Sequence, residues 1–195
     1  MKSPATDAGK LAGREVLVGV TGGIAAYKTA ALVSRLVQDG AAVSVIMTEH
    51  ATEFVGAITF QALTGRPVHT DLFVSPEVYR AEHISLAEKA DLVVVAPATA
   101  NCLAKLALGL ADDLLSTVLL AIDVPLVLAP AMNARMWAHP AVRANVETLG
   151  QRGAKFVGPR EGYLACGTTG PGRMAEPEEI LAVVTKILAG RPGKK

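Results

Sequence analysis

The sequence contains little cysteine: Cys102 and Cys166 are the two cysteines among its 195 residues. Two cysteines do not make the disulfide framework that stabilises many small secreted domains. The first residues, MKSPATDAGKLAGRE, are polar where a secretory signal peptide has an apolar segment. We therefore expect a protein of the reducing cytoplasm.

The sequence also lacks an excess of one charge and a long apolar run. Lys and Arg number 19 and Asp and Glu 18, and this balance argues against nucleic acid or an anionic membrane as a partner. The longest apolar region, Leu114 to Met132, is interrupted by Asp123 and two prolines, so it makes a poor membrane span. No spacing of His, Cys and Asp suggests a metal site, and no Gly-x-Ser-x-Gly motif suggests a serine hydrolase.

Aromatic residues are scarce as well, at 4%, although 51% of the residues are hydrophobic. These residues form short, β-branched runs that are typical of strands buried on both faces, and the runs alternate with helix-length segments. This alternation predicts one α/β domain over residues 1–195, an open parallel sheet with helices on both faces and loose tails at 1–13 and 191–195. The predicted strands are 15–20, 42–47, 91–96, 124–129 and 154–158. The predicted helices are 24–39, 51–63, 100–107, 112–122, 140–151 and 177–188.

The turns after the first two predicted strands are candidate cofactor loops, because ligands of such sheets bind beyond the carboxyl ends of the strands. Gly22 and Gly23 stand at a helix start, where backbone amides suit a phosphate, although a simple connecting turn is the alternative. The spacing is neither a dinucleotide fingerprint nor a P-loop. After the second strand, Thr48 offers a hydroxyl, and Glu49 is a candidate to bind the ribose of a dinucleotide.

The segment after the third predicted strand offers further polar groups. Pro97 gives a rigid turn, Thr99 a hydroxyl and Asn101 an amide. We expect Asp112 to cap the next helix and Cys102, on an apolar helix face, to be a packing residue.

The stretch PAMNARMW, Pro130 to Trp137, follows the fourth predicted strand. Asn133 supplies a donor and an acceptor that suit a carboxylate or an amide, whereas Met132 and Met136 form an adaptable apolar wall. Trp137 is predicted to fill the core.

A glycine-rich segment, Gly158 to Met174, follows the fifth predicted strand and is expected to be a mobile loop that could close as a lid. Cys166 lies within it and is a candidate for a chemical role. His83 precedes a predicted short amphipathic helix, where it is either a helix-entry residue or a general base.

Five motifs in this order resemble the homo-oligomeric flavin-containing cysteine decarboxylases: GVTGGIAAYK, EHISL, APATANCLAKLALGLADDLL, PAMNARMW and GYLACGTTGPGRM. The resemblance covers about Glu15 to Leu188. It is strongest to the branch that decarboxylates 4′-phosphopantothenoylcysteine in coenzyme A biosynthesis. It implies a flavodoxin-like sheet, bound FMN, and a trimer or multiple of trimers whose active sites lie between subunits.

The resemblance also implies roles for individual residues. His83 matches an active-site histidine, Asn133 the residue that holds the substrate carboxylate, and Cys166 the cysteine of a flap. Met136 and Ala165 fall in the substrate-binding motifs. The implied FMN loops contain Gly22, Gly23, Ile24, Ala25, Thr48, Pro97, Ala98, Thr99 and Asn101.

The implied chemistry explains the need for a flavin. A cysteine-derived carboxylate has no electron sink, so the thiol is first oxidised to a thioaldehyde, from which carbon dioxide can leave. In that scheme His83 assists proton removal, and Cys166 delivers a proton in the final reduction to the thiol.

Other interpretations remain open at the level of sequence. A flavin prenyltransferase shares the fold and FMN, a regulatory flavoprotein binds FMN without catalysis, and a dinucleotide-binding module would use Glu49. In bacteria the decarboxylase domain is often fused to a phosphopantothenoylcysteine synthetase, so a synthetase partner is also expected, and the chain either stands alone or is cut from such a fusion.

Overall fold

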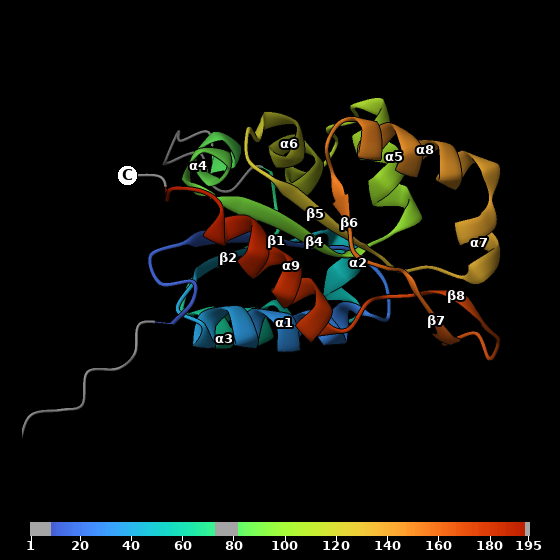
Figure 1. The fold of residues 1–195 in the computed structure, drawn as a ribbon, viewed down its shortest axis with the longest axis horizontal. Coiled ribbons are helices and arrows are strands. Elements are labelled where there is room, and N and C mark those ends of the chain that lie inside the picture. Colours follow the sequence, from blue (N-terminus) through green and yellow to red (C-terminus); the bar gives the residue numbers. More distant parts are fainter. Residues whose placement is uncertain (1–8, 73–81, 194–195) are drawn as a thin grey trace, which may run out of the picture.

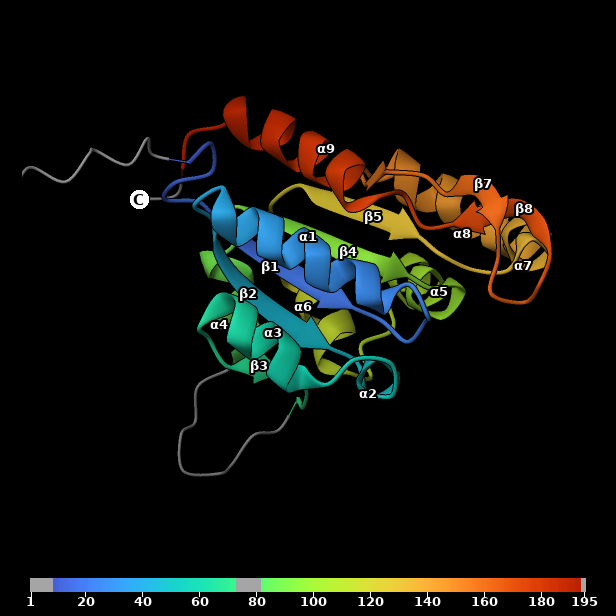
Figure 2. The same ribbon diagram turned by 90° about the horizontal axis from the view of Figure 1, so that it is seen from below.

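The computed structural model describes residues 9–72 and 82–193, which form a six-stranded sheet between two layers of helices (Figures 1 and 2). All strands of this sheet are parallel, and their order is β3-β2-β1-β4-β5-β6. The strands are β1 (Glu15–Val20), β2 (Ala42–Met47), β3 (Val68–His69), β4 (Leu92–Ala98), β5 (Leu126–Pro130) and β6 (Lys155–Phe156). The predicted flavodoxin-like α/β architecture is confirmed.

Each face of the sheet carries its own hydrophobic core. Helices α1 (Ala26–Gln38), α3 (Ala57–Thr64) and α9 (Pro177–Ala189) cover one face, and α4 (Glu82–Lys89), α5 (Ala100–Leu108), α6 (Leu114–Ala121) and α8 (Pro140–Gln151) cover the other. Val16 and Val18 of β1 pack into the first core and Leu17 into the second. Because both faces are buried, the central strands β4 and β5 are apolar at every position rather than at alternate ones.

Two predicted segments differ from the observed helices. The single helix expected at 51–63 is two helices, α2 (Glu49–Thr52) and α3, because the chain is extended at Gly56, which caps α3. The stretch expected to be a loop after β5 contains a short helix, α7 (Ala134–Ala138). Within the described part of the chain, no helix has both the length and the apolar character that crossing a membrane requires.

The predicted tails are shorter than expected. Leu11 is buried in the first core, and its backbone N–H donates to the Asp39 carbonyl at 2.8 Å. Arg14 donates to the Leu188 carbonyl at the end of α9, at 2.9 Å, and to the carbonyl of Arg191. The remaining tail residues, 1–8 and 194–195, lie outside the described residues.

The glycine-rich segment is not an irregular loop. It forms an antiparallel hairpin of β7 (Arg160–Tyr163) and β8 (Thr169–Arg173), with Cys166 in the connection. The hairpin lies beside α7 at one end of the molecule (Figure 1). The sequence did not predict this hairpin because its residues have low intrinsic β-propensity, and the strand pairing and the contacts to α7 hold it instead.

Candidate functional site

A cavity of about 1510 Å³ opens beyond the carboxyl ends of the central strands. It is lined by the loops that follow β1, β2, β4 and β5 and by the hairpin. The strand order reverses between β1 and β4, and such a switch point is where open α/β sheets bind ligands. The cavity exceeds the roughly 300 to 1,000 Å³ of an ordinary small-molecule site, so it has room for two ligands.

The two glycines after β1, Gly22 and Gly23, differ in whether the surrounding protein leaves room for a side chain. A Cβ atom on Gly22 would lie 2.4 Å from the Cβ of His50, so this glycine is required for close packing against α2. A Cβ atom on Gly23 would lie no closer than 3.6 Å to Thr99 and 3.8 Å to Pro97, which is ordinary contact. Gly23 therefore has no steric reason for lacking a side chain within the protein itself.

The start of α1 faces the cavity without a side-chain cap. Its N-cap residue, Ala25, offers no side-chain hydrogen bond, and Ile24 and Tyr27 of this turn are more than half exposed. Free backbone amides and the positive end of a helix are a suitable cradle for a phosphate. The residues present thus fit a phosphorylated cofactor.

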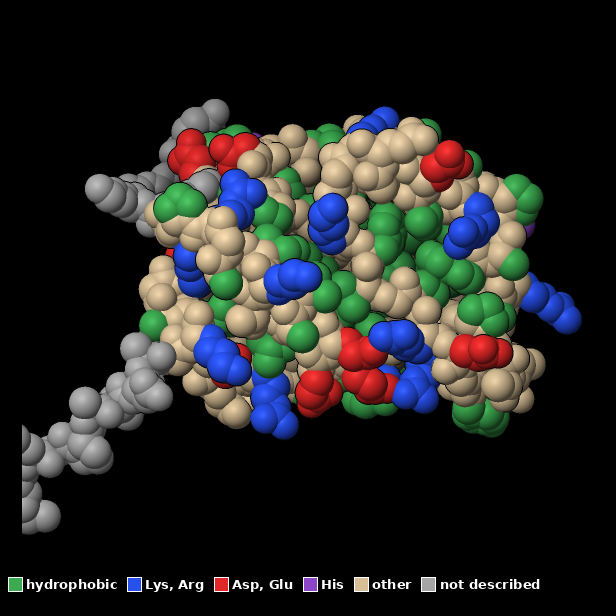
Figure 3. Space-filling model, viewed as in Figure 1, with side chains coloured by type: hydrophobic (Ala, Val, Ile, Leu, Met, Phe, Trp, Pro, Cys, Tyr) green, Lys and Arg blue, Asp and Glu red, His purple; other side chains and the backbone are tan. Residues whose placement is uncertain are grey.

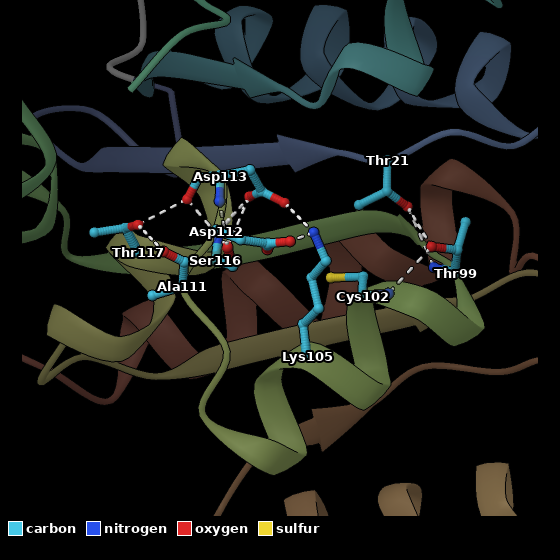
Figure 4. Close-up of polar contacts among 9 residues, drawn as sticks. All are labelled: Thr21, Thr99, Cys102, Lys105, Ala111, Asp112, Asp113, Ser116 and Thr117. Atoms are coloured by element: carbon cyan, nitrogen blue, oxygen red, sulfur yellow. Dashed lines mark hydrogen bonds and ion pairs between the residues drawn. The ribbon is translucent and has the colours of Figure 1, made fainter. Parts of the chain in front are cut away.

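Hydrogen bonds join the β1 turn to the β4 turn (Figure 4). The Thr21 hydroxyl donates to the Pro97 carbonyl at 2.6 Å and accepts from the Thr99 backbone N–H at 3.2 Å. The Thr99 hydroxyl in turn caps α5 by accepting from the Cys102 N–H at 3.4 Å. Thr21 was missed from the sequence because a threonine at a strand end carries no distinctive pattern.

A second polar cluster lies on the cavity wall between α5 and α6 (Figure 4). Lys105 Nζ lies 2.6 Å from Asp112 and 2.7 Å from Asp113. Asp113, and not Asp112 as predicted, caps α6 in a capping box with Ser116. The capping geometry requires the residue directly before the helix, and Asp112 pairs with Lys105 instead.

Burial disfavours the charged forms of Asp113 and Lys105, but the hydrogen bonds within the cluster favour them more strongly. Burial alone would raise the pKa of Asp113, yet hydrogen bonds from Lys105 and Ser116 hold that pKa below its usual value. Burial would likewise lower the pKa of Lys105, and hydrogen bonds to Asp112 and Asp113 raise it. Lys105 itself could have pointed to this cluster in the sequence, because it is the one charged residue of α5.

The two cysteines have opposite environments. Cys102 is buried in the second core, where desolvation raises the pKa of its thiol to about 12, so its predicted packing role is confirmed. Cys166 is exposed at the tip of the hairpin and lines the cavity. Hydrogen bonding with Thr168, and less strongly with Asn133, lowers the pKa of Cys166.

Asn133 and Cys166, which are 33 residues apart, meet at the cavity. Asn133 Nδ2 donates to Cys166 Sγ at 3.0 Å. Asn133 Oδ1 accepts from the Arg135 backbone N–H at 2.8 Å and so caps α7. The loop after β5 and the hairpin thus present an amide and a thiol side by side.

Backbone contacts fix the hairpin against this loop. The Met132 N–H donates to the Gly172 carbonyl at 2.9 Å. A Cβ atom on Gly172 would lie 2.1 Å from the Met132 carbonyl oxygen, and its φ of 145° also favours glycine. Only glycine permits this close approach.

Ion pairs fix the base of the hairpin. Arg173 and Lys28 both pair with Glu176, Lys28 Nζ at 3.0 Å, and Arg160 pairs with Glu179. Acidic and basic side chains accordingly gather where the first turn of α9 meets α1 and the hairpin (Figure 3).

Most of the predicted site residues line this cavity: Gly22, Gly23, Ile24, Ala25, Thr48, Thr99, Asn101, Asn133, Met136, Ala165 and Cys166. Pro97 and Ala98 are buried behind the wall, where the Pro97 carbonyl is engaged by Thr21. Trp137 does not fill the core as predicted. It is half-buried on α7 beneath the Arg143 guanidinium, 5.1 Å from the ring centre, because α7 contributes no buried residue.

Of the three predicted catalytic residues, Asn133 and Cys166 line the cavity of a single chain and His83 does not. It lies half-buried in the first turn of α4, and α4 packs against α6. Glu49 lines the cavity and is exposed.

The sequence matches the family described as Flavoprotein over residues 4–189. The chain belongs to the flavoprotein family. It is 53% identical over 90% of its length to the coenzyme A biosynthesis bifunctional protein CoaBC of Bacillus subtilis and 48% identical over 90% to that of Mycolicibacterium smegmatis. It spans less than half of these relatives, 43% and 42% of their lengths.

Solved structures of flavoproteins share the fold over nearly the whole chain. The FMN-dependent cysteine decarboxylase SpaF is 34% identical with a TM-score of 0.81, and the match covers 92% of this chain and 97% of SpaF. A PPC decarboxylase mutant complexed with pantothenoylaminoethenethiol is 30% identical with a TM-score of 0.81, covering 90% and 98% of the two chains. The family resemblance read from the motifs is confirmed.

Proposed function

We propose that this chain is an FMN-dependent carboxy-lyase that converts 4′-phosphopantothenoylcysteine to 4′-phosphopantetheine in coenzyme A biosynthesis. The observation that carries the proposal is the contact of Asn133 with Cys166 at the edge of a cavity that begins at the β1 glycine turn. Membership of the flavoprotein family and similarity to bifunctional CoaBC proteins and to a PPC decarboxylase support it.

We assign cofactor binding to the loops on the sheet side of the cavity. The backbone at Gly23, Ile24 and Ala25 would hold the FMN phosphate, and Thr48, Thr99 and Asn101 would contact the rest of the cofactor. When bound, FMN supplies the reversible two-electron oxidation that gives the carboxylate an electron sink.

The protein's own groups then hold the substrate and move protons. Asn133 Nδ2 has a second N–H beyond the one donated to Cys166, and this group would hold the substrate carboxylate until carbon dioxide leaves. Met136 and Ala165 would pack against the arm of the substrate. Cys166 would deliver a proton to the unsaturated product, since its thiol is exposed to the cavity and its pKa is lowered.

The position of His83 leads us to propose that the active site is completed in a homotrimer or a multiple of trimers. Within one chain His83 lies away from the cavity, and Ile84 beside it is 40% exposed. At the rim of the cavity, Ile24, Tyr27 and Phe54 are exposed apolar side chains. Burial of such side chains by α4 of a second copy would bring its His83 to the cavity as a general base. A phosphopantothenoylcysteine synthetase is the proposed partner enzyme.

The decisive experiment is incubation of the purified protein with 4′-phosphopantothenoylcysteine, followed by mass spectrometry for loss of carbon dioxide. Yellow protein that releases phosphopantetheine supports the proposal. Yellow protein without turnover would favour a regulatory flavoprotein, and yellow protein that prenylates its flavin would favour a prenyltransferase. Colourless protein that binds NAD would favour a dinucleotide-binding module.

A further inference from the structure

The thiol of Cys166 has two polar side chains beside it, one from the loop after β5 and one from the hairpin connection itself. Asn133 Nδ2 lies 3.0 Å from Sγ, and the hydroxyl of Thr168 lies 3.2 Å from it. Thr168 has no counterpart among the site residues expected from the motifs.

We propose that Thr168 is a positioning residue that holds the sulfur of Cys166 ready to deliver its proton. The inference rests on the proposed role of Cys166 in the decarboxylase. The proton leaves the S–H bond for the product, the electron pair stays on sulfur, and solvent restores the proton at this exposed position. A hydroxyl and an amide both donate to the thiolate that remains, and such donors stabilise the charged form.

The backbone places the Thr168 hydroxyl independently of its hydrogen bond to sulfur. The Leu164 N–H donates to the Thr168 carbonyl at 2.8 Å, and the Gly167 N–H donates to the Leu164 carbonyl at 2.9 Å. Gly167 has a φ of 82°, which allows the chain to turn between Cys166 and Thr168. Removal of the hydroxyl therefore leaves both backbone bonds that close the connection intact.

Hydrogen bonds, rather than a neighbouring charge, lower the pKa of the Cys166 thiol, and the bond with Thr168 contributes most. Arg173 pairs with Glu176, and the ring of His139 caps α8. The charged or titratable side chains on the elements that surround the thiol are Arg160, Glu161, Tyr163 and Arg173 of the hairpin and Arg135 and His139 at the two ends of α7.

The test is the rate of alkylation by iodoacetamide of the FMN-loaded protein, measured from neutral to alkaline pH. Thr168→Val keeps the shape of threonine and removes the hydroxyl. Loss of the hydrogen bond from the Thr168 hydroxyl should make alkylation about 2- to 10-fold slower at neutral pH and displace the profile to higher pH. Thr168→Ser restores a hydroxyl and should restore the wild-type profile, and Thr169→Val, at the next exposed threonine, should not change it.

Further variants exclude other causes. Cys166→Ser removes the reactive thiol and identifies its signal, since Cys102 is buried with a pKa of about 12. Thr168→Ala serves if the valine variant does not fold. A wild-type profile for Thr168→Val and Thr168→Ala, or a serine variant as slow as the valine variant, would overturn the inference. Because alkylation requires no substrate, a displaced profile in a protein that fails to decarboxylate would refute the proposed function and leave the positioning intact.

Discussion

Asn133 uses both ends of its amide within the protein: Oδ1 caps α7 through the Arg135 N–H, and Nδ2 donates to Cys166 Sγ. One N–H of Nδ2 therefore remains for a ligand. The residue proposed to hold the carboxylate and the residue proposed to supply the proton are in direct contact before any substrate binds.

Asn133→Asp tests the carboxylate contact without loss of the helix cap, because Asp and Asn are equivalent at an N-cap position. The change removes the donors and places a negative charge against the substrate. We expect substrate affinity to fall by about 1.5 to 3 kcal/mol, which is on the order of 10- to 150-fold, with FMN retained. Isothermal titration calorimetry measures this. Asn133→Ser retains a capping oxygen without the charge and separates the two effects; unchanged affinity in both variants would exclude the contact.

Gly23→Asp tests the phosphate cradle. A side chain at Gly23 meets little of the protein, whereas one at Gly22 would collide with His50 and confuse loss of cofactor with misfolding. We expect Gly23→Asp to purify without flavin because its carboxylate repels the phosphate, and Gly23→Ala to retain some flavin. The ratio of flavin to protein absorbance reports the result. A fully yellow Gly23→Asp protein would place the phosphate elsewhere.

Lys105→Met tests the cluster between α5 and α6. Two carboxylates would lose their shared cation, and Lys105 is only 17% exposed, so we expect the free energy of unfolding to fall by about 1 to 3 kcal/mol in urea denaturation. Asp112→Asn, at a carboxylate that is 67% exposed, should cost less than about 1 kcal/mol. Equal losses in the two variants would contradict this account.

The same cluster has a predictable pH dependence. Because the pKa of folded Asp113 lies below its ordinary value of 3.8, its ionisation stabilises the fold above that pH, and the contribution is lost as pH falls through the lower folded pKa. Asp113→Asn keeps a capping side chain. The stability difference between wild type and this variant, measured by thermal unfolding, should shrink in that acid range; a constant difference would be inconsistent.

His83→Asn tests the general base and the assembly together. We expect reduction of the flavin by substrate to slow by about 10² to 10⁴ in stopped flow while colour and binding persist. If His83 of one copy serves the cavity of another, co-expression of His83→Asn with Cys166→Ser should restore turnover to some sites. Two inactive variants that stay inactive together would place both groups in one chain's site.

The sheet could be predicted because each buried strand is recognisable from its own short run of apolar residues. Strand β4 reads as apolar at every position, and burial on both faces requires that pattern. Asn133 and Cys166 could be identified as candidate site residues because an amide and a thiol are unusual in such loops. The Lys105 contacts and the Thr168 contact were not, since each depends on how a loop folds back on its neighbour. The hairpin was missed because its glycines signal a loop, and its order comes from Met132 and from the ion pairs at its base.

The hydrogen bond from Met132 to Gly172 lies one residue from Asn133 in the chain. This bond joins the backbone next to Asn133 to β8, the strand that follows Cys166. The two backbones approach so closely at Gly172 that no side chain fits between them. These contacts constrain the position of the Asn133 amide relative to the Cys166 thiol, independently of the β1 turn. The proposed carboxylate contact and the proposed proton donor therefore belong to one structural unit. The position of this unit relative to the bound cofactor would set the geometry of the reaction.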